Sequence, residues 1–135
     1  MLPISWPRFF TMWVSMAIAM SANGIFRELA LRKITSSTIA DILSAIIGMV
    51  LIAFITWAGF RPMTTPPPRT LLAASVLLVL LTVTFETVLG IAVDRKSMSE
   101  LVDHYAIWRG QLWPLVLAFL AYSPFLWAKW QPAIR

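Results

Sequence analysis

Four long apolar segments constrain this chain more than any other feature of its sequence. A helix of about 20 apolar residues crosses the hydrocarbon core of a bilayer. The segments run from Phe9 to Phe26, from Ile42 to Phe60, from Leu71 to Val93 and from Gly110 to Ala128, and Glu86 is the one charged residue within them. The sequence therefore predicts an all-α integral membrane protein with four transmembrane helices. We expect residues 1–135 to form a single four-helix domain.

The composition agrees with a lipid environment. Charged residues make up 13% of the chain, against about 25% in a typical soluble domain, which argues against both a disordered chain and a soluble enzyme. The net charge of +5 comes from basic residues that stand singly or in pairs at the ends of apolar segments. Such residues anchor helices among phospholipid headgroups, as do the tryptophans near the segment ends. The lipid bilayer, and not nucleic acid, is the expected partner.

The three connections between the segments are short and differ in character. The first, residues 27–41, is polar, and Ser37 or Thr38 is expected to cap the second helix. The second, residues 61–69, contains three consecutive prolines, which favour a stiff extended turn.

The third connection, residues 94–109, predicts more than a loop. Ser97 and Glu100 have the spacing of a capping box, and Leu101, Tyr105 and Trp108 recur at helical intervals. We expect a short amphipathic helix at the membrane interface before the fourth span. Pro124 is expected to kink that span, with its lost hydrogen bond compensated locally.

Four spans place both termini on one side of the membrane. The termini and second connection carry five basic residues, and the other two connections carry six. If Arg27 and Arg109 lie inside the bundle, the balance becomes five against four, which favours cytoplasmic termini by a small margin.

Glu86 is the most informative polar residue. It lies eight residues before Asp94, so about 12 Å inside the polar end of the third segment. A carboxyl group at that depth is neutral, paired or in contact with water. Thr82 and Gly90 share its helix face, which suits contact with another helix. A proton or cation site and a structural ion pair both explain this residue.

A second group lies where the first segment ends. Asn23 and Arg27 share a helix face, and Glu28 has the i, i+4 spacing to pair with Arg32. Arg27 fits either a marker of the membrane interface or part of a buried site. Asn23 fits an interhelical hydrogen bond at least as well as a ligand site.

A third group, Asp103, His104, Tyr105 and Arg109, precedes the fourth segment. Tyr105 and Arg109 are expected to share a helix face, and His104 titrates near neutral pH. A proton route and a solvated interfacial helix both explain the group. An alternating topology brings all three groups into one leaflet, so a polar vestibule closed by an apolar plug is expected there. The candidate cluster consists of Asn23, Arg27, Glu28, Glu86, Asp103, Tyr105 and Arg109.

Groups that carry common chemistries are missing. The chain has no cysteine and one histidine, which argues against metal centres and thiol nucleophiles. It also has no glycine-rich phosphate loop, no G-x-S-x-G and no H-E-x-x-H. We therefore expect a protein without catalytic residues, cofactor or metal, and a lipid-modifying enzyme is the third-ranked possibility.

Three short motifs carry a resemblance. They are Asn23-Gly24-x-x-Arg27-Glu28, Phe85-Glu86-x-x-x-Gly90 and Tyr105-x-x-x-Arg109-Gly110-Gln111-Leu112-Trp113. In these the chain resembles a family of small bacterial four-helix membrane proteins of unknown function, over nearly its whole length. The resemblance implies a protein of the bacterial inner membrane and implies no activity.

Two functions follow as expectations. The first is a non-enzymatic membrane protein whose buried charges pass a proton, ion or small solute, as a homo-oligomer because four helices rarely enclose a pathway alone. The alternative is an accessory subunit of a larger membrane complex, which the short connections and the lack of a soluble domain favour.

Overall fold

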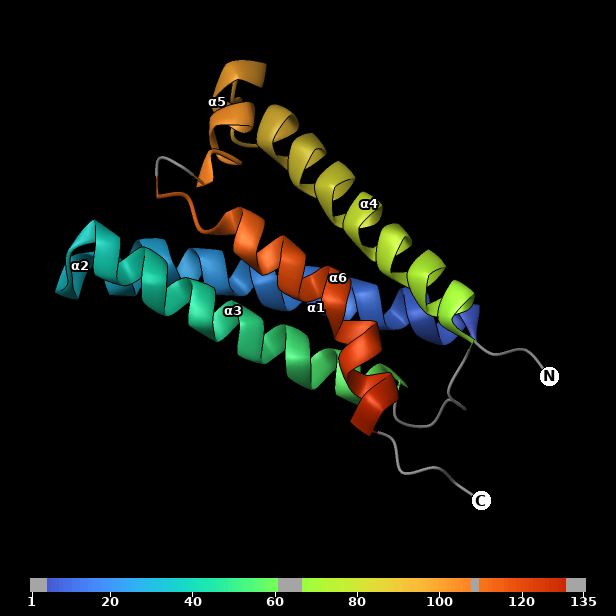
Figure 1. Ribbon diagram of the computed structural model, residues 1–135. Coiled ribbons are helices and arrows are strands. Elements are labelled where there is room, and N and C mark those ends of the chain that lie inside the picture. Colours follow the sequence, from blue (N-terminus) through green and yellow to red (C-terminus); the bar gives the residue numbers. More distant parts are fainter. Residues whose placement is uncertain (1–4, 61–66, 108–109, 131–135) are drawn as a thin grey trace.

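The computed structural model describes residues 5–60, 67–107 and 110–130, and in these ranges it contains helices and turns but no strand. The elements are α1 (Trp6–Phe26), the π-helix η1 (Arg27–Leu31), α2 (Arg32–Ile34), α3 (Ser37–Phe60), α4 (Pro68–Ala92), α5 (Met98–Asp103) and α6 (Trp113–Trp130) (Figure 1). The all-α prediction is confirmed. Within the described ranges, three helical stretches are long and apolar enough to cross a membrane, namely Trp6–Ile34, Ser37–Phe60 and Pro68–Ala92.

The first helix is longer than expected. Residues 27–34, which the sequence placed in a connection, continue α1 as η1 and α2. The Glu28–Arg32 pair at 3.2 Å spans this extension and supports it, as an i, i+4 pair does. The connection to α3 is therefore only two residues, Thr35 and Ser36. Ser36, and not Ser37 or Thr38, caps α3, because its hydroxyl accepts a bond of 3.3 Å from the Ile39 amide.

One face of α3 consists largely of small residues. Its buried positions recur every four residues as Ala40, Ser44, Gly48, Ile52 and Thr56. Small side chains allow helix backbones to approach closely, and polar ones among them bond across the interface. The Asn23 amide of α1 donates to the Ser44 carbonyl at 2.9 Å. The indole of Trp127 on α6 donates to the Thr56 hydroxyl at 2.9 Å, so α1 and α6 are both fixed to this face.

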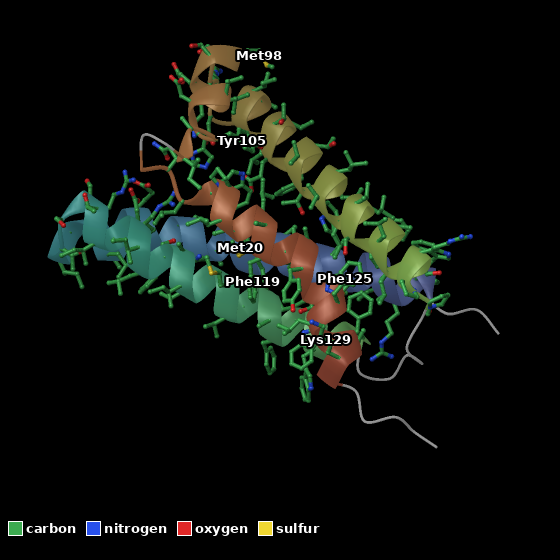
Figure 2. All side chains as sticks on the ribbon, in the orientation of Figure 1. Met20, Met98, Tyr105, Phe119, Phe125 and Lys129 are labelled. Atoms are coloured by element: carbon green, nitrogen blue, oxygen red, sulfur yellow. The ribbon has the colours of Figure 1, made fainter. Side chains whose placement is uncertain are left out.

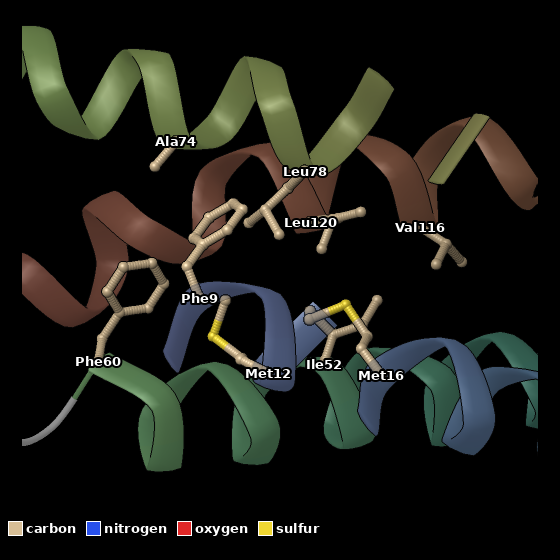
Figure 3. Packing of buried hydrophobic residues seen from close by; sticks show 9 residues of the cluster. All are labelled: Phe9, Met12, Met16, Ile52, Phe60, Ala74, Leu78, Val116 and Leu120. Atoms are coloured by element: carbon tan, nitrogen blue, oxygen red, sulfur yellow. The ribbon is translucent and has the colours of Figure 1, made fainter. Parts of the chain in front are cut away.

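The apolar core fills the half of the bundle that lies away from α5. Figure 3 shows side chains from four helices meeting there. The cluster consists of Phe9, Met12, Met16, Ile52, Phe60, Ala74, Leu78, Val116 and Leu120. At the same end, the Arg8 guanidinium donates to the Gly59 carbonyl at 3.0 Å. It thereby satisfies part of the unpaired C-terminal turn of α3, where a cation is favourable.

The last helix bends at a proline, as predicted. Pro124 lies inside α6 and has no amide hydrogen to donate to the Leu120 carbonyl. The buried Ser123 hydroxyl donates to that carbonyl instead, at 2.7 Å. The lost bond is therefore replaced locally, and α6 changes direction in its last turns (Figure 1).

α4 meets α1 at one end and diverges from it at the other (Figure 1). Trp13 joins the two helices: its indole donates to the Thr82 hydroxyl at 3.2 Å, and its ring meets Phe85 edge-on at 5.9 Å. Beyond this point α4 runs toward α5, and Leu101 of α5 packs against Gly90. The face of Thr82, Glu86 and Gly90 thus contacts other helices at both its ends.

The short helix before the fourth segment is present but ends earlier than expected. Ser97 caps α5, because its hydroxyl accepts a bond of 3.2 Å from the Glu100 amide. Tyr105 lies in the turn after α5, where its amide bonds to the Val102 carbonyl at 3.0 Å. The expected helical face shared by Tyr105 and Arg109 is therefore wrong at Tyr105, and Arg109 lies outside the described residues.

Gly48 and Gly24 test the close approach of α1 and α3. A Cβ at Gly48 would lie 2.9 Å from Met20 Cε and 3.3 Å from Asn23 Nδ2, whereas a Cβ at Gly24 meets nothing within 4 Å. We expect Gly48→Leu to lower the free energy of unfolding by about 1–3 kcal/mol through overpacking. The matched Gly24→Leu is expected to leave it unchanged or raise it slightly, because leucine is the better helix former. Thermal unfolding in detergent measures both; equal effects would contradict this packing.

Candidate functional site

A cavity of about 990 Å³ opens where α4 diverges from α1. Its walls come from the end of α1 and η1, the start of α3, the second half of α4 and the residues that lead into α6. Figure 2 shows that Tyr105 and Met98 lie at this end of the bundle, while Lys129 lies at the opposite end. The polar residues that line the cavity are Ser21, Asn23, Arg27, Glu28, Arg32, Asp41, Ser44, Glu86, Asp94, Lys96, His104 and Gln111.

Four of these side chains form an ion network on one wall. Arg32 lies 3.2 Å from Glu28 and 3.1 Å from Asp41, and Arg27 lies 3.5 Å and 3.8 Å from the same two carboxylates. The network links η1 and α2 to the start of α3. Two cations balance two anions, so this wall is electrically neutral as a whole.

Glu86 faces the network from α4 and lies at a junction. It lines the large cavity, a smaller one of about 170 Å³ beside α5, and a narrow apolar pocket of about 20 Å³ between α1, α4 and α6. Trp13, Met16, Phe85 and Leu120 are among the walls of the narrow pocket. In the described part of the chain, no cation lies within 4 Å of the Glu86 carboxylate, which leaves the expectation of a structural ion pair unsupported.

Among the residues that the structure describes, more acidic than basic side chains line the large cavity. Its cationic residues are Arg27, Arg32 and Lys96, and its acidic residues are Glu28, Asp41, Glu86 and Asp94. With every group ionised, three positive and four negative charges give a sum of −1, in a protein whose net charge is +5. Positively charged solutes are therefore favoured inside it.

Among the described residues, three buried polar atoms near the cavity lack a hydrogen bond. They are Asn23 Oδ1, Arg27 Nε and Trp113 Nε1, and all three residues line the cavity walls. The amide of Asn23 cannot be rotated to change this, because its nitrogen must face the Ser44 carbonyl to which it donates. Buried polar atoms are usually paired, so each unpaired one marks a place where a polar ligand or water binds favourably.

The seven candidate residues divide between the cavities. Asn23, Arg27, Glu28 and Glu86 line the large one. Asp103 and Tyr105 line the smaller one beside α5, together with Glu86, Glu100 and Lys96. Arg109 lies outside the described residues. The interhelical hydrogen bond expected of Asn23 is present, so this residue has a structural role as well as a place in the cavity wall.

His104 lies between the two cavities and lines both. Its ring stacks on the indole of Trp113, with 5.9 Å between ring centroids. Burial lowers the pKa of His104 below its ordinary value of 6.5, and the nearby charges of Lys96 and Arg27 lower it further, while Asp41 opposes them. The imidazole is therefore neutral at pH 7 and provides one donor and one acceptor.

Several lining residues were not singled out from the sequence as cluster members. Asp41 is not a member of the candidate cluster, but it bonds to Arg32 at 3.1 Å and joins two elements. Lys96, Gln111 and Trp113 are not members of the cluster either, although Gln111 and Trp113 stand in the third of the short motifs. Their positions depend on the divergence of α4, for which the sequence holds no local pattern. Among the described residues, no group of three acidic or histidine side chains is placed to hold a metal ion.

Comparison of the chain with protein-family models, curated proteins and solved structures gives no match. The resemblance to small bacterial four-helix membrane proteins therefore stays a prediction. The site has to be interpreted from its own geometry.

His104 makes stability depend on pH. Because the folded state lowers its pKa, the unfolded chain binds the proton more readily, and stability falls as the pH drops below about 6.5. Each unit by which the pKa is lowered corresponds to about 1.4 kcal/mol. We expect His104→Gln to remove the decline between pH 6.5 and 5, measured as thermal unfolding in detergent. An identical decline in the variant would contradict this assignment.

Proposed function

We propose that the chain spans the bacterial inner membrane four times, with α6 as the fourth span and both termini in the cytoplasm. α6 is only 18 residues long and contains two prolines and Lys129. It nevertheless packs along α3 and α4 through Trp127, Val116 and Leu120, which is the position of a bundle helix. Large apolar side chains point outward from the long helices, as in Ile18, Val50 and Leu80, which are each more than half exposed. Such surfaces suit lipid.

Single cysteines test the number of spans. The native chain has no cysteine, so it is an unlabelled background for a membrane-impermeant maleimide. We expect Lys33→Cys and Val102→Cys to react in intact spheroplasts, and Arg69→Cys and Lys129→Cys to react only after permeabilisation. If Lys129→Cys instead reacts together with Val102→Cys, α6 does not cross the membrane.

The function that the geometry supports best is the passage of a proton, ion or small solute of positive charge. One observation carries this proposal: Glu86, an acidic side chain with no cationic partner among the described residues, lies where a polar cavity meets a narrow apolar pocket. An ionisable residue inside a membrane segment is expensive, and it commonly marks a pathway. A polar cavity that ends at an apolar constriction is the form of a half-channel.

The narrow pocket also bears on the assembly. At about 20 Å³ it holds no more than about one water molecule. One chain therefore does not form an open path through its apolar half. A homo-oligomer, in which neighbouring copies complete the path, fits the proposal. An accessory subunit of a larger complex is the second candidate, favoured by the outward-facing Met98 and Val102 on α5, which are 60% and 63% exposed.

Glu86→Gln tests the proposal directly. We expect the variant to fold and to lose cation or proton flux in proteoliposomes, because the amide keeps the shape of the side chain but carries no charge. Glu100→Gln is the matched control: Glu100 is exposed on α5 and does not line the large cavity. Flux is measured with a pH-sensitive dye for protons and by tracer uptake for alkali cations.

Three results would contradict passage of a cation by this protein alone. They are no flux in the native protein, unchanged flux in Glu86→Gln, and equal losses in both variants. Copurification of the native protein with a second membrane protein at fixed stoichiometry would favour the accessory subunit.

A further inference from the structure

We propose that the large cavity binds the primary ammonium group of an amphipathic molecule, with the ammonium at Glu86 and the hydrocarbon part between α1 and α4. This inference deepens the proposed function, because it rests on the same cavity and names the class of its ligand. Four observations support it: the size of the cavity, its charge, an unpaired acceptor on its wall and its apolar rim.

The size favours an organic molecule. The cavity measures about 990 Å³, which lies at the upper end of the range of about 300–1,000 Å³ for small-molecule sites. A proton or an alkali ion needs no such space. The volume accommodates a charged head and several carbon atoms together.

The charge favours an ammonium group at one place. The network of Arg27, Arg32, Glu28 and Asp41 balances itself on the α1 and α3 side. Asp94 and Lys96 contribute one charge of each sign at the end of α4. Among the described lining residues, Glu86 is the acidic group whose charge no basic residue balances. Its side chain is half-buried among apolar neighbours. A charge-assisted hydrogen bond to its carboxylate is stronger there than in water.

Asn23 favours an ammonium that carries hydrogens. Asn23 is 7% exposed, lines the cavity, and its Oδ1 accepts no hydrogen bond in the described structure. Its amide nitrogen is held by Ser44, so the oxygen is fixed as an acceptor. A primary ammonium has three N–H donors to offer to oxygen acceptors on the cavity wall, whereas a quaternary ammonium has none.

The rim of the cavity favours a hydrocarbon chain. Ile25 and Leu29 on the α1 side line the cavity and are 60% and 62% exposed, and Val93 lines it on the α4 side. These side chains are exposed, and they stand near the ends of α1 and α4 that have diverged (Figure 1). Inside, Met20 and Val116 provide further apolar contact. A molecule can therefore keep its tail in lipid while its head reaches Glu86.

The test compares three probes with one tail. The native protein, in nanodiscs of phosphatidylglycerol, is titrated with decylammonium, decyltrimethylammonium and decanol. Tryptophan fluorescence reports binding, because Trp113 lines the cavity, and protein-free nanodiscs correct for partition into lipid. We expect decylammonium to bind at least about tenfold more tightly than either other probe, since only it offers both charge and N–H donors. Equal affinities for all three probes would overturn the inference.

Two variants separate the head from the tail. Glu86→Gln is expected to remove the preference for decylammonium over decanol, while Glu100→Gln keeps it. Leu29→Ser removes apolar surface from the rim of the cavity, and it is expected to weaken decylammonium binding more than methylammonium binding. If Glu86→Gln does not fold, the three-probe comparison on the native protein still decides.

The binding experiment also distinguishes a lipid headgroup from a free amine as the natural ligand. Together with the flux measurement, it separates failure of this inference from failure of the proposed function. Phosphatidylethanolamine in the nanodisc will compete with decylammonium if the natural ligand is a lipid headgroup, and will not compete if it is a free amine. Selective binding without flux would support this inference and contradict permeation. Flux that depends on Glu86, without selective binding, would support permeation and contradict this inference.

Discussion

Ala40, Ser44 and Gly48 on α3 let α1 approach closely, and the rest of the arrangement depends on this contact. The hydrogen bond from Asn23 to the Ser44 carbonyl fixes its register. Further along the same face, Thr56 receives the Trp127 indole and holds α6. α1 and α6 are thereby packed tightly against α3. α4 joins them through α6 and through Trp13, which leaves its second half free to diverge and to form the cavity.

The two walls of that cavity are built in opposite ways. On the α1 and α3 side, charges lie close together and balance one another, so the network of Arg27, Arg32, Glu28 and Asp41 stabilises the turn between the helices. Each of these side chains is partly exposed, so the pairs contribute modestly and mainly fix geometry. On the α4 side, Glu86 has no such partner. The wall on the α1 and α3 side therefore stabilises the fold, whereas on the α4 wall the Glu86 carboxylate, which has no cationic partner among the described residues, can accept hydrogen bonds from a ligand.

The sequence predicted the helices well and the site only in part. The lengths of the apolar segments identified the long helices. The capping-box spacing identified Ser97 as a helix cap, and the proline inside the fourth segment indicated that its lost hydrogen bond is replaced locally. The continuation of α1 through residues 27–34 was missed because its polar residues resemble a loop, although the Glu28–Arg32 spacing indicated a helix. Lys96 and Trp113 line the site because α4 tilts away from α1, and this tilt depends on packing between distant segments and has no local pattern.

The position of Glu86 connects stability to function. A charged carboxylate that faces lipid is costly. On insertion scales, the free energy of placing a comparable charged group at the centre of a membrane helix is about 2.5–3.5 kcal/mol. The cavities lower that cost because Glu86 lines their polar walls and does not face lipid alone. A structural role would be better served by an ion pair, and Arg27 on the opposite wall is instead held by Glu28 and Asp41. The two arginines are thus held on the other wall, and no described cation, Lys96 included, lies within 4 Å of the carboxylate, which is an arrangement that suits a site for a positively charged molecule.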